Sequence, residues 1–268
     1  MSTAATSLPA DVSSRFSSDE VSQFERDGYA IVRGLADGEL VREMTEATLA
    51  GLEQRIEPIE YEADVQYPGS PSSRSAEGGA TVRRLKEAQS RHPAFTRWIS
   101  QPAVLGRLQQ LLGPRVVLPL AHHNCVMTKQ PAYSSETHWH QDIRYWTYQQ
   151  PNLVSLWLGL RRETKENGCL QLIPGSHRQS FERERYDEAL FFRQDFAPNQ
   201  ELIATRIFAE LEPGDALFFH CRTLHAAGRN LTSEPKFSVV FTFRPAENLP
   251  LPGSRSAAKP ELLLPAAT

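Results

Sequence analysis

Residues 153–160, LVSLWLGL, and residues 237–244, FSVVFTFR, decide the fold class of this chain. They are short runs rich in Val, Leu, Phe and Trp, and turn residues separate them from their neighbours. From Val116 onward, runs of the same kind of composition recur in VVLPLAHHNCVMTK (116–129), ETHWHQDIRYW (136–146), CLQLIPG (169–175), LIATRIFAEL (202–211) and DALFFH (215–220). Seven or more such strands are typical of a sandwich or barrel. We therefore predict a mainly β fold, a double-stranded β-helix (a cupin-like jelly roll), with flanking helices.

The flanking helices are expected before Val116. Ser18-Asp19-Glu20 is an N-cap with an acidic first turn for a helix through Arg26, and GYAIVRGL (28–35) follows as a short strand. Apolar residues at helical spacing predict two more helices, at 40–56 and around 104–112.

Composition divides the chain into three parts. Residues 1–16 and 249–268 are rich in Pro, Ser and Ala and lack periodicity, so we expect a mobile N-terminus and a mobile or draped C-terminal tail. Residues 17–248 are predicted to form a single jelly-roll domain. The charged segment 180–200 is expected to be an insertion near the mouth of a site.

Charge and hydropathy exclude several functions. With a net charge of −3 and a pI near 6.3, the chain has no basic face for nucleic acid. No apolar run approaches the ~20 residues that cross a bilayer, and the first residues do not resemble a signal peptide. Three scattered cysteines are expected to be reduced. We predict a cytoplasmic protein with a small-molecule substrate and no membrane or nucleic-acid partner. The sequence does not indicate an oligomeric state.

The pair His140 and Asp142 carries the candidate chemistry. Side chains two apart in a strand project from the same face, so an imidazole and a carboxylate lie together. A histidine far downstream, His225, is placed to supply a third ligand. Two histidines and one carboxylate leave three sites on an octahedral Fe(II) open for a bidentate co-substrate and O₂.

A His-x-Asp pair alone is weak evidence, but three motifs in order strengthen it. The segments HWHQD (138–142), ENGCLQLIPGSH (166–177) and PGDALFFHCRTLHAAGRN (213–230) resemble the phytanoyl-CoA dioxygenase family of Fe(II)- and 2-oxoglutarate-dependent oxygenases. The resemblance runs from GYAIVRGL to Arg244. It implies His140, Asp142 and His225 as catalytic iron ligands, with His220 as the competitor for the third position.

The resemblance also implies the reaction. Oxidative decarboxylation of 2-oxoglutarate by O₂ would release succinate and CO₂ and leave a hydroxyl group on a small organic substrate. Related halogenases lack the carboxylate ligand, so the presence of Asp142 favours hydroxylation.

The chain departs from the family where 2-oxoglutarate is bound. Lys236 stands where relatives place an arginine for the remote carboxylate, and a lysine cannot make the two-bond fork. We expect Lys236 to bind the carboxylate nonetheless. Alternatively, Lys236 is a solvated loop residue, and either Arg244 fills the role or the co-substrate is a different acid. Ala226-Ala227 replaces a Gly-Ser whose hydroxyl assists in relatives.

The resemblance assigns other pocket residues less firmly. Trp157, Asn124 and Arg84 are expected to bind the co-substrate, although a tryptophan in LVSLWLGL could equally be core. Arg144, Tyr145 and Trp146 follow the metal strand, where relatives contact substrate; packed rings and a surface arginine would look the same.

Two other functions remain open at this point. A non-catalytic binding or regulatory jelly roll could have kept the scaffold and lost the chemistry. A cupin-type metalloenzyme could use the same shell without 2-oxoglutarate, because function depends on the site and not on the fold.

Overall fold

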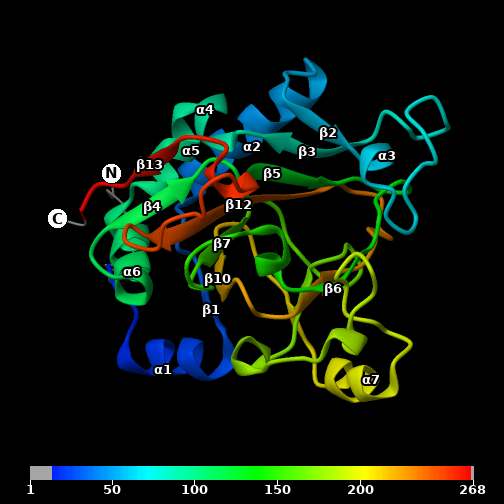
Figure 1. The fold of residues 1–268 in the computed structure, drawn as a ribbon. Helices are drawn as coiled ribbons and strands as arrows, with labels where there is room; N and C mark the ends of the chain where they lie inside the picture. The colour runs from blue at the N-terminus through cyan, green and yellow to red at the C-terminus, as the bar shows by residue number, and fades with distance from the viewer. Residues whose placement is uncertain (1–13, 267–268) are drawn as a thin grey trace, which may run out of the picture.

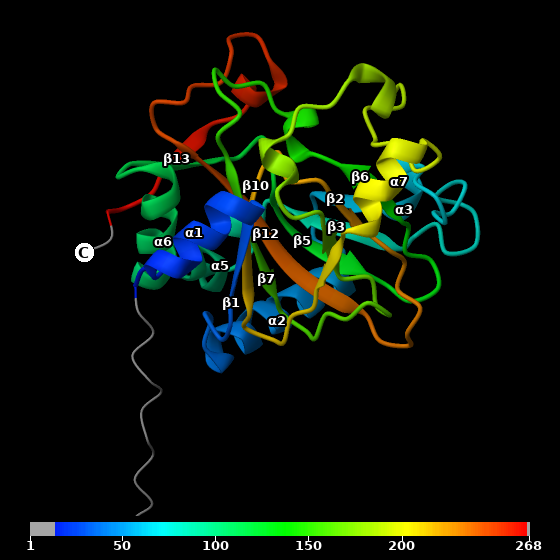
Figure 2. The ribbon, with the colours of Figure 1, turned by 90° about the horizontal axis from the view of Figure 1, so that it is seen from below.

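Two antiparallel sheets face one another in this protein, and helices cover the outer face of the larger sheet (Figures 1 and 2). The computed structural model describes residues 14–266. The jelly-roll prediction is confirmed by the two sheets with their flanking helices. No helix among the described residues is long and apolar enough to cross a membrane.

The larger sheet has the strand order β1-β10-β7-β12-β5-β3-β2. Its strands are β1 (Tyr29–Val32), β2 (Ile59–Tyr61), β3 (Val82–Lys86), β5 (Asn124–Lys129), β7 (Val154–Gly159), β10 (Ala216–His220) and β12 (Lys236–Pro245). A short side branch joins β12 through β4 (Val116–Pro119), which in turn pairs with β13 (Glu261–Leu263).

The smaller sheet has the order β6-β11-β8-β9. Its strands are β6 (Thr137–His140), β8 (Leu170–Leu172), β9 (Ile207–Ala209) and β11 (His225–Ala227). In the ladder between β11 and β6, His225 is the partner of His140. Two of the three predicted metal ligands are therefore neighbours across strands.

Helices occupy most of the chain before β4. They are α1 (Ser18–Asp27), α2 (Gly38–Glu53), α3 (Glu62–Val65), α4 (Ala88–Arg91), α5 (Pro93–Ile99) and α6 (Pro102–Leu112), and α7 (Ala197–Ala204) follows later. The N-cap of α1 is Ser17, one residue before the predicted cap, and it forms a capping box with Glu20.

Strand alternation on β12 separates two cores. Phe237, Val239, Phe241 and Phe243 pack on the helix side of the larger sheet. Val240 faces the other way, into a cluster that also contains side chains of the smaller sheet. Because the strand is covered on both faces, its sequence is almost continuously apolar. The space between the sheets is where the site lies.

Two strand predictions are wrong in extent, and a third, 116–129, is two strands, β4 and β5, separated by a turn. Pairing of the ETHWHQDIRYW segment ends at His140, and Asp142–Tyr145 forms a 3₁₀ turn. The first part of LIATRIFAEL ends helix α7, and only 207–209 is strand. In both segments the sequence is apolar enough for either structure, and contacts with the rest of the fold decide it.

The C-terminal segment lies along the domain and is bonded to it. Strand β13 pairs with β4, and the buried Ser256 hydroxyl accepts a hydrogen bond from the Thr147 amide at 2.8 Å. At the other end, Phe16 is buried against Phe218. Residues 1–13 lie outside the described residues, and the predicted division at 17 and 248 stays a prediction.

Candidate metal centre and active site

His140, Asp142 and His225 converge between the two sheets. Each offers a ligand atom, and these atoms all lie within 4.8 Å of one another. Asp142 Oδ1 is 3.7 Å from His140 Nε2 and 3.6 Å from His225 Nε2. All three side chains are buried. The three residues that the sequence predicted as ligands therefore form one cluster.

The strand argument for His140 and Asp142 holds although the strand ends between them. Gln141 keeps extended backbone angles (φ −109°, ψ 133°), so the alternation of side chains continues through it. His140 and Asp142 consequently share a face, and the 3₁₀ turn begins at Asp142 itself.

Backbone carbonyls orient both imidazoles. His140 Nδ1 is 2.8 Å from the His138 carbonyl, and His225 Nδ1 is 3.0 Å from the Thr223 carbonyl. A carbonyl only accepts, so each Nδ1 carries the proton and each Nε2 presents a lone pair to the centre. This arrangement fixes the tautomer that metal-binding histidines use.

The cluster fits a metal ion. Asp142 Oδ1 is a buried oxygen with no hydrogen-bond partner among the described residues, and it faces the two Nε2 atoms. An unpaired buried carboxylate oxygen is costly unless a cation satisfies it. Burial, followed by the proximity of His225, holds the pKa of His140 well below its usual value, so that imidazole is a neutral donor. Two nitrogens and one carboxylate oxygen suit non-haem Fe(II).

The second carboxylate oxygen of Asp142, Oδ2, lies against Ser155 and His123. Ser155 Oγ donates to Oδ2 at 3.3 Å, and His123 Nδ1 lies 3.6 Å from it. Burial alone would raise the pKa of Asp142, but His123, the two ligand histidines and the Ser155 hydrogen bond together lower it. The carboxylate is therefore ionised and oriented at neutral pH.

His220, the competing third ligand, is not part of the cluster. Its Nδ1 accepts a hydrogen bond from the Arg222 amide at 3.1 Å, and its ring packs against His177 with centroids 5.4 Å apart. Burial, followed by the neighbouring His177, lowers the pKa of His220 to about 4. His220 is thus a packed, neutral side chain.

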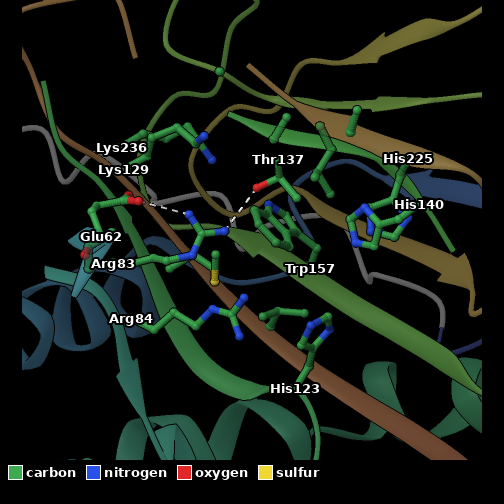
Figure 3. Close-up of a pocket in the computed structure, with 17 residues that line it drawn as sticks. Glu62, Arg83, Arg84, His123, Lys129, Thr137, His140, Trp157, His225 and Lys236 are labelled. Carbon is green, nitrogen blue, oxygen red and sulfur yellow. Dashed lines mark hydrogen bonds and ion pairs between the residues drawn. The ribbon is translucent and has the colours of Figure 1, made fainter. Parts of the chain in front are cut away.

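One cavity extends from the histidine pair to two lysines, and we call it the lysine cavity (Figure 3). In this view Trp157 lies between His140 and His225 on one side and the ends of Lys129 and Lys236 on the other. Of the residues predicted for the co-substrate, Lys236, Trp157 and Arg84 line this cavity. Ala226 and Ala227 line it as well.

Lys236 is buried in an ion pair. Its Nζ lies 2.9 Å from Glu163 Oε2 and 3.1 Å from Ser238 Oγ, and both charged side chains are at most 2% exposed. Glu163 also accepts from Ser238 Oγ at 2.6 Å and from Trp157 Nε1 at 2.8 Å. The alternative that Lys236 is a solvated loop residue is wrong. Trp157 contacts both the cavity and this acid.

Arg244, the alternative cation, is engaged elsewhere. Its guanidinium pairs with Glu261 of β13 and donates to the Pro245 and Ala246 carbonyls at 2.8 Å and 2.9 Å. It therefore anchors the C-terminal segment.

Lys129 is a cavity residue that the sequence analysis did not identify. Its Nζ donates to the Ser135 carbonyl at 3.0 Å and to the Gly228 carbonyl at 2.5 Å. Burial, followed by the charges of Arg83 and Lys236, lowers its pKa to about 7. The sequence carried no signal for it, because no residue on its face of β5 had been assigned to the site.

Three of the four cations lining the lysine cavity have carboxylate partners. The pairs are Arg83 with Glu62 at 3.1 Å, Arg84 with Glu60 at 3.1 Å, and Lys236 with Glu163 at 2.9 Å. Lys129, the fourth, is bonded to carbonyls. When Lys129 is protonated, four positive charges face three carboxylates in these pairs, an excess of one.

A second cavity meets the first at the metal cluster, and we call it the tail cavity because the C-terminal segment forms part of its wall. The two cavities share Arg84, His123, Thr137 and His140. The C-terminal segment contributes Arg255, Ala258 and Lys259. The two cavities thus join at His140, one of the three residues of the metal cluster.

The remaining predicted residues lie around the tail cavity. Tyr145 and Trp146 line it, and Tyr145 shares a hydrogen bond of 3.1 Å with Tyr67. Asn124 also lines it, but the Asn124 amide is bonded to Gln89. This places Asn124 away from the lysines.

Arg144 and Phe191 cover the metal ligands. The Arg144 guanidinium lies 3.7 Å from the ring centroid of Phe191 and 4.3 Å from that of Tyr145. Phe191 packs against His140 at 5.9 Å between centroids. Phe191 belongs to the 180–200 segment. Part of this segment therefore lies over the site, as predicted from its charged composition.

Comparisons with known proteins agree with this geometry. The family model for phytanoyl-CoA dioxygenase (PhyH) matches residues 24–238. An ectoine dioxygenase from Streptomyces avermitilis is 26% identical over 263 residues, covering 91% of this chain and 84% of that protein.

Two solved structures share the fold. EctD from S. alaskensis, with 2-oxoglutarate and 5-hydroxyectoine, has a TM-score of 0.74 at 20% identity, covering 91% of this chain and 82% of that one. The epimerase SnoN, in complex with Fe³⁺, alpha-ketoglutarate and nogalamycin RO, has a TM-score of 0.69 at 22% identity, covering 87% and 85%. Both structures contain a keto acid together with a second small molecule.

The matched family model, the intact cluster of two histidines and one aspartate, and the shared fold lead to one assignment. They exclude the non-catalytic and cupin-type alternatives. The chain belongs to the phytanoyl-CoA dioxygenase family of non-haem iron and 2-oxoglutarate-dependent dioxygenases.

Proposed function

We propose that this dioxygenase hydroxylates a small organic substrate, with 2-oxoglutarate entering through the lysine cavity and the substrate through the tail cavity. The observation that carries the proposal is the position of Asp142 Oδ1, a carboxylate oxygen without a partner among the described residues. It faces the Nε2 atoms of His225 and of His140, the ligand that lines both cavities. A complete set of two nitrogens and one carboxylate favours hydroxyl transfer.

His140 Nε2, Asp142 Oδ1 and His225 Nε2 would hold the iron. With 2-oxoglutarate and O₂ bound, iron supplies the oxidising chemistry: one oxygen atom is retained in succinate as CO₂ leaves, and the other becomes the hydroxyl of the product. The His138 and Thr223 carbonyls keep both imidazoles in the donor tautomer, and Ser155 holds Asp142.

The lysine cavity suits a dicarboxylic keto acid. It begins at the two histidines, Trp157 forms a flat wall along it, and cations lie at its far end (Figure 3). We infer that Trp157 and Lys236 contact the co-substrate and that Arg84, at the junction of the two cavities, contributes positive charge there.

The tail cavity suits a small anionic or aromatic substrate. Its lining includes four cations, Arg84, Lys86, Arg255 and Lys259, against two acids, Glu60 and Glu87. Tyr145 and Trp146 provide aromatic surface, and Arg144 holds Tyr145 in place by stacking. We keep the cytoplasmic location as a prediction.

An anaerobic titration tests the function. Purified protein receives Fe(II) and then 2-oxoglutarate, and the weak visible charge-transfer band of an iron-bound keto acid is recorded before O₂ is admitted and succinate is measured. We expect a band and slow succinate formation in the wild type, and neither in Asp142→Ala. Bound iron without a band, or succinate formation that survives in Asp142→Ala, would sink the proposal.

A further inference from the structure

Two lysines on adjacent strands meet at the end of the lysine cavity away from the histidines. In the ladder between β5 and β12, Lys129 is the partner of Lys236. Both line the cavity, and their side chains end side by side in Figure 3. The Lys236 ammonium contributes to lowering the pKa of Lys129, as expected for neighbouring positive charges.

The two ammonium groups differ in their neutralisation. Lys236 is matched by the buried Glu163, so the pair has no net charge. Lys129 has no carboxylate within 4 Å among residues 14–266, and its contacts are the carbonyls of Ser135 and Gly228. The positive charge that can attract an anion into this end of the cavity therefore belongs to Lys129.

Both groups keep one donor unused. An ammonium has three N–H donors, and each lysine spends two of them, Lys129 on its two carbonyls and Lys236 on Glu163 and Ser238. Two remaining donors from two lysines match the two oxygens of one carboxylate. A single arginine provides the same pair of bonds through its fork.

We propose that Lys129 and Lys236 together bind the remote carboxylate of 2-oxoglutarate, with Lys129 supplying the net charge because Glu163 cancels that of Lys236. The inference rests on the proposed function and assigns the end of its co-substrate site. Glu163 is a positioning residue. It accepts hydrogen bonds from Lys236, Ser238 and Trp157 and so holds Lys236 in place. Its negative charge also reduces the attraction of the site for an anion.

The test compares two keto acids of equal length. Iron-loaded protein is titrated anaerobically with 2-oxoglutarate and with 2-oxopentanoate, which has a methyl group in place of the remote carboxylate, and both dissociation constants are read from the charge-transfer band. We expect Lys129→Met to bind 2-oxoglutarate about 10- to 100-fold more weakly, the range for a lost bond to a charged group, and 2-oxopentanoate within about threefold of the wild type.

A double variant separates the two lysines. In Lys236→Met/Glu163→Gln both charges of the neutral pair are removed together with one of the two bonds to the carboxylate, so we expect 2-oxoglutarate to bind more weakly than in the wild type but more tightly than in Lys129→Met, because the cavity's net charge is unchanged. The exposed Lys165→Met is the matched control and should bind both acids normally. Unchanged 2-oxoglutarate binding in Lys129→Met, or an equal loss in the double variant, overturns the inference.

Two further outcomes are decided by the same titrations. If Lys129→Met also binds 2-oxopentanoate poorly, its fold is damaged, and the variant Glu163→Gln decides instead. Glu163→Gln frees the charge of Lys236, so the preference for 2-oxoglutarate over 2-oxopentanoate should rise several-fold. An unchanged ratio of the two dissociation constants rejects the inference. If the wild type gives no charge-transfer band with either acid, the proposed function itself fails. If the wild type gives a band but Lys129→Met has the same ratio of dissociation constants for the two acids, only the assignment of the lysine pair is rejected.

Discussion

Glu163 Oε2 lies 2.9 Å from Lys236 Nζ, and neither side chain is more than 2% exposed. The cation that stands where relatives place a carboxylate-binding arginine is therefore already matched by an acid of its own chain. Glu163 lies four residues beyond the end of β7, the strand that carries Trp157, and it accepts from three donors, the Lys236 ammonium, the Ser238 hydroxyl and the Trp157 indole. Such a pair is far more costly to break than to remove as a whole.

The first prediction concerns stability. Lys236→Met leaves the Glu163 carboxylate buried without a cation, and we expect the free energy of unfolding to fall by about 3–5 kcal/mol. Chemical denaturation monitored by far-UV circular dichroism measures it.

The double variant Lys236→Met/Glu163→Gln is the control. It removes both charges and keeps an oxygen for the Trp157 and Ser238 donors, so we expect most of the stability to return, to within about 1–2 kcal/mol of the wild type. If the single and double variants unfold at the same denaturant concentration, the ion pair is not what the buried acid requires.

The second prediction concerns pH. Burial, followed by Arg83 and Lys236, lowers the pKa of Lys129 to about 7, while Glu62 and Glu136 act in the opposite direction. Only the protonated ammonium attracts a carboxylate, so binding of 2-oxoglutarate should weaken as pH rises through this pKa. Between pH 6.5 and pH 8 we expect about an eightfold loss.

The same titration with 2-oxopentanoate corrects for other ionisations, because that acid has no remote carboxylate. Lys129→Arg keeps its charge over this range and should flatten the curve. Equal pH dependence for the two keto acids in the wild type would contradict a role for Lys129 in this interval.

The third prediction concerns the metal. Asp142→Ala removes the one anionic ligand, and we expect iron affinity to fall about 100-fold or more. His220→Gln alters the neighbouring histidine that packs on His177 and should retain one iron per chain. Metal content after gel filtration distinguishes the two, and iron loss in His220→Gln without loss of fold would reopen the identity of the third ligand.

The metal ligands could be predicted because each lies in a short segment whose residue types and spacing are typical of a metal site. His140 and Asp142 are two residues apart in an extended segment, and His225 follows a recognisable turn and strand. Strand periodicity and ligand chemistry made His140 and Asp142 candidates, and the resemblance of three motifs to a known family completed the set with His225 in preference to His220. The prediction did not depend on the exact end of β6, because Gln141 stays extended.

Charge pairing across the fold could not be predicted in this way. Glu163 and Lys236 are separated by 73 residues and meet only because β7 and β12 are adjacent. Lys129 and Lys236 are likewise brought together by register. A single sequence shows that each charge exists, whereas its partner depends on strand order, and the sequence analysis therefore gave Lys236 no partner within the chain.

The fourth prediction concerns the C-terminal segment. Ending the chain after Asn248 removes β13, the buried Ser256 and the Glu261 partner of Arg244. Arg244 is 3% exposed and would keep only carbonyl acceptors. We expect a loss of about 3 kcal/mol or more in the free energy of unfolding.

A matched variant isolates the ion pair within that effect. Glu261→Gln keeps the segment and removes one charge, so it should account for part of the loss. A truncated chain as stable as the full one would show that residues 249–268 are dispensable for the domain, as a mobile tail would be.

The fifth prediction concerns Gly168, which sets the position of Lys129. Its φ is +77°, a conformation that residues with a side chain adopt only under strain, and a Cβ added there would lie 2.4 Å from the Gly228 carbonyl oxygen and 2.9 Å from Lys129 Cδ. That carbonyl is the one that accepts from the Lys129 ammonium. Gly168→Ala should therefore lower the free energy of unfolding by about 1–3 kcal/mol and also displace the lysine. In the keto-acid titration we expect 2-oxoglutarate to bind more weakly while binding of 2-oxopentanoate is unaffected.

Gly34→Ala serves as the control, because Gly34 also has a positive φ, +59°, but has no atom within 4 Å of an added Cβ. Gly34→Ala should lower the free energy of unfolding and leave keto-acid binding unchanged. A Gly168→Ala protein that is destabilised yet binds 2-oxoglutarate normally would show that the close contact is structural and does not hold the lysine in place.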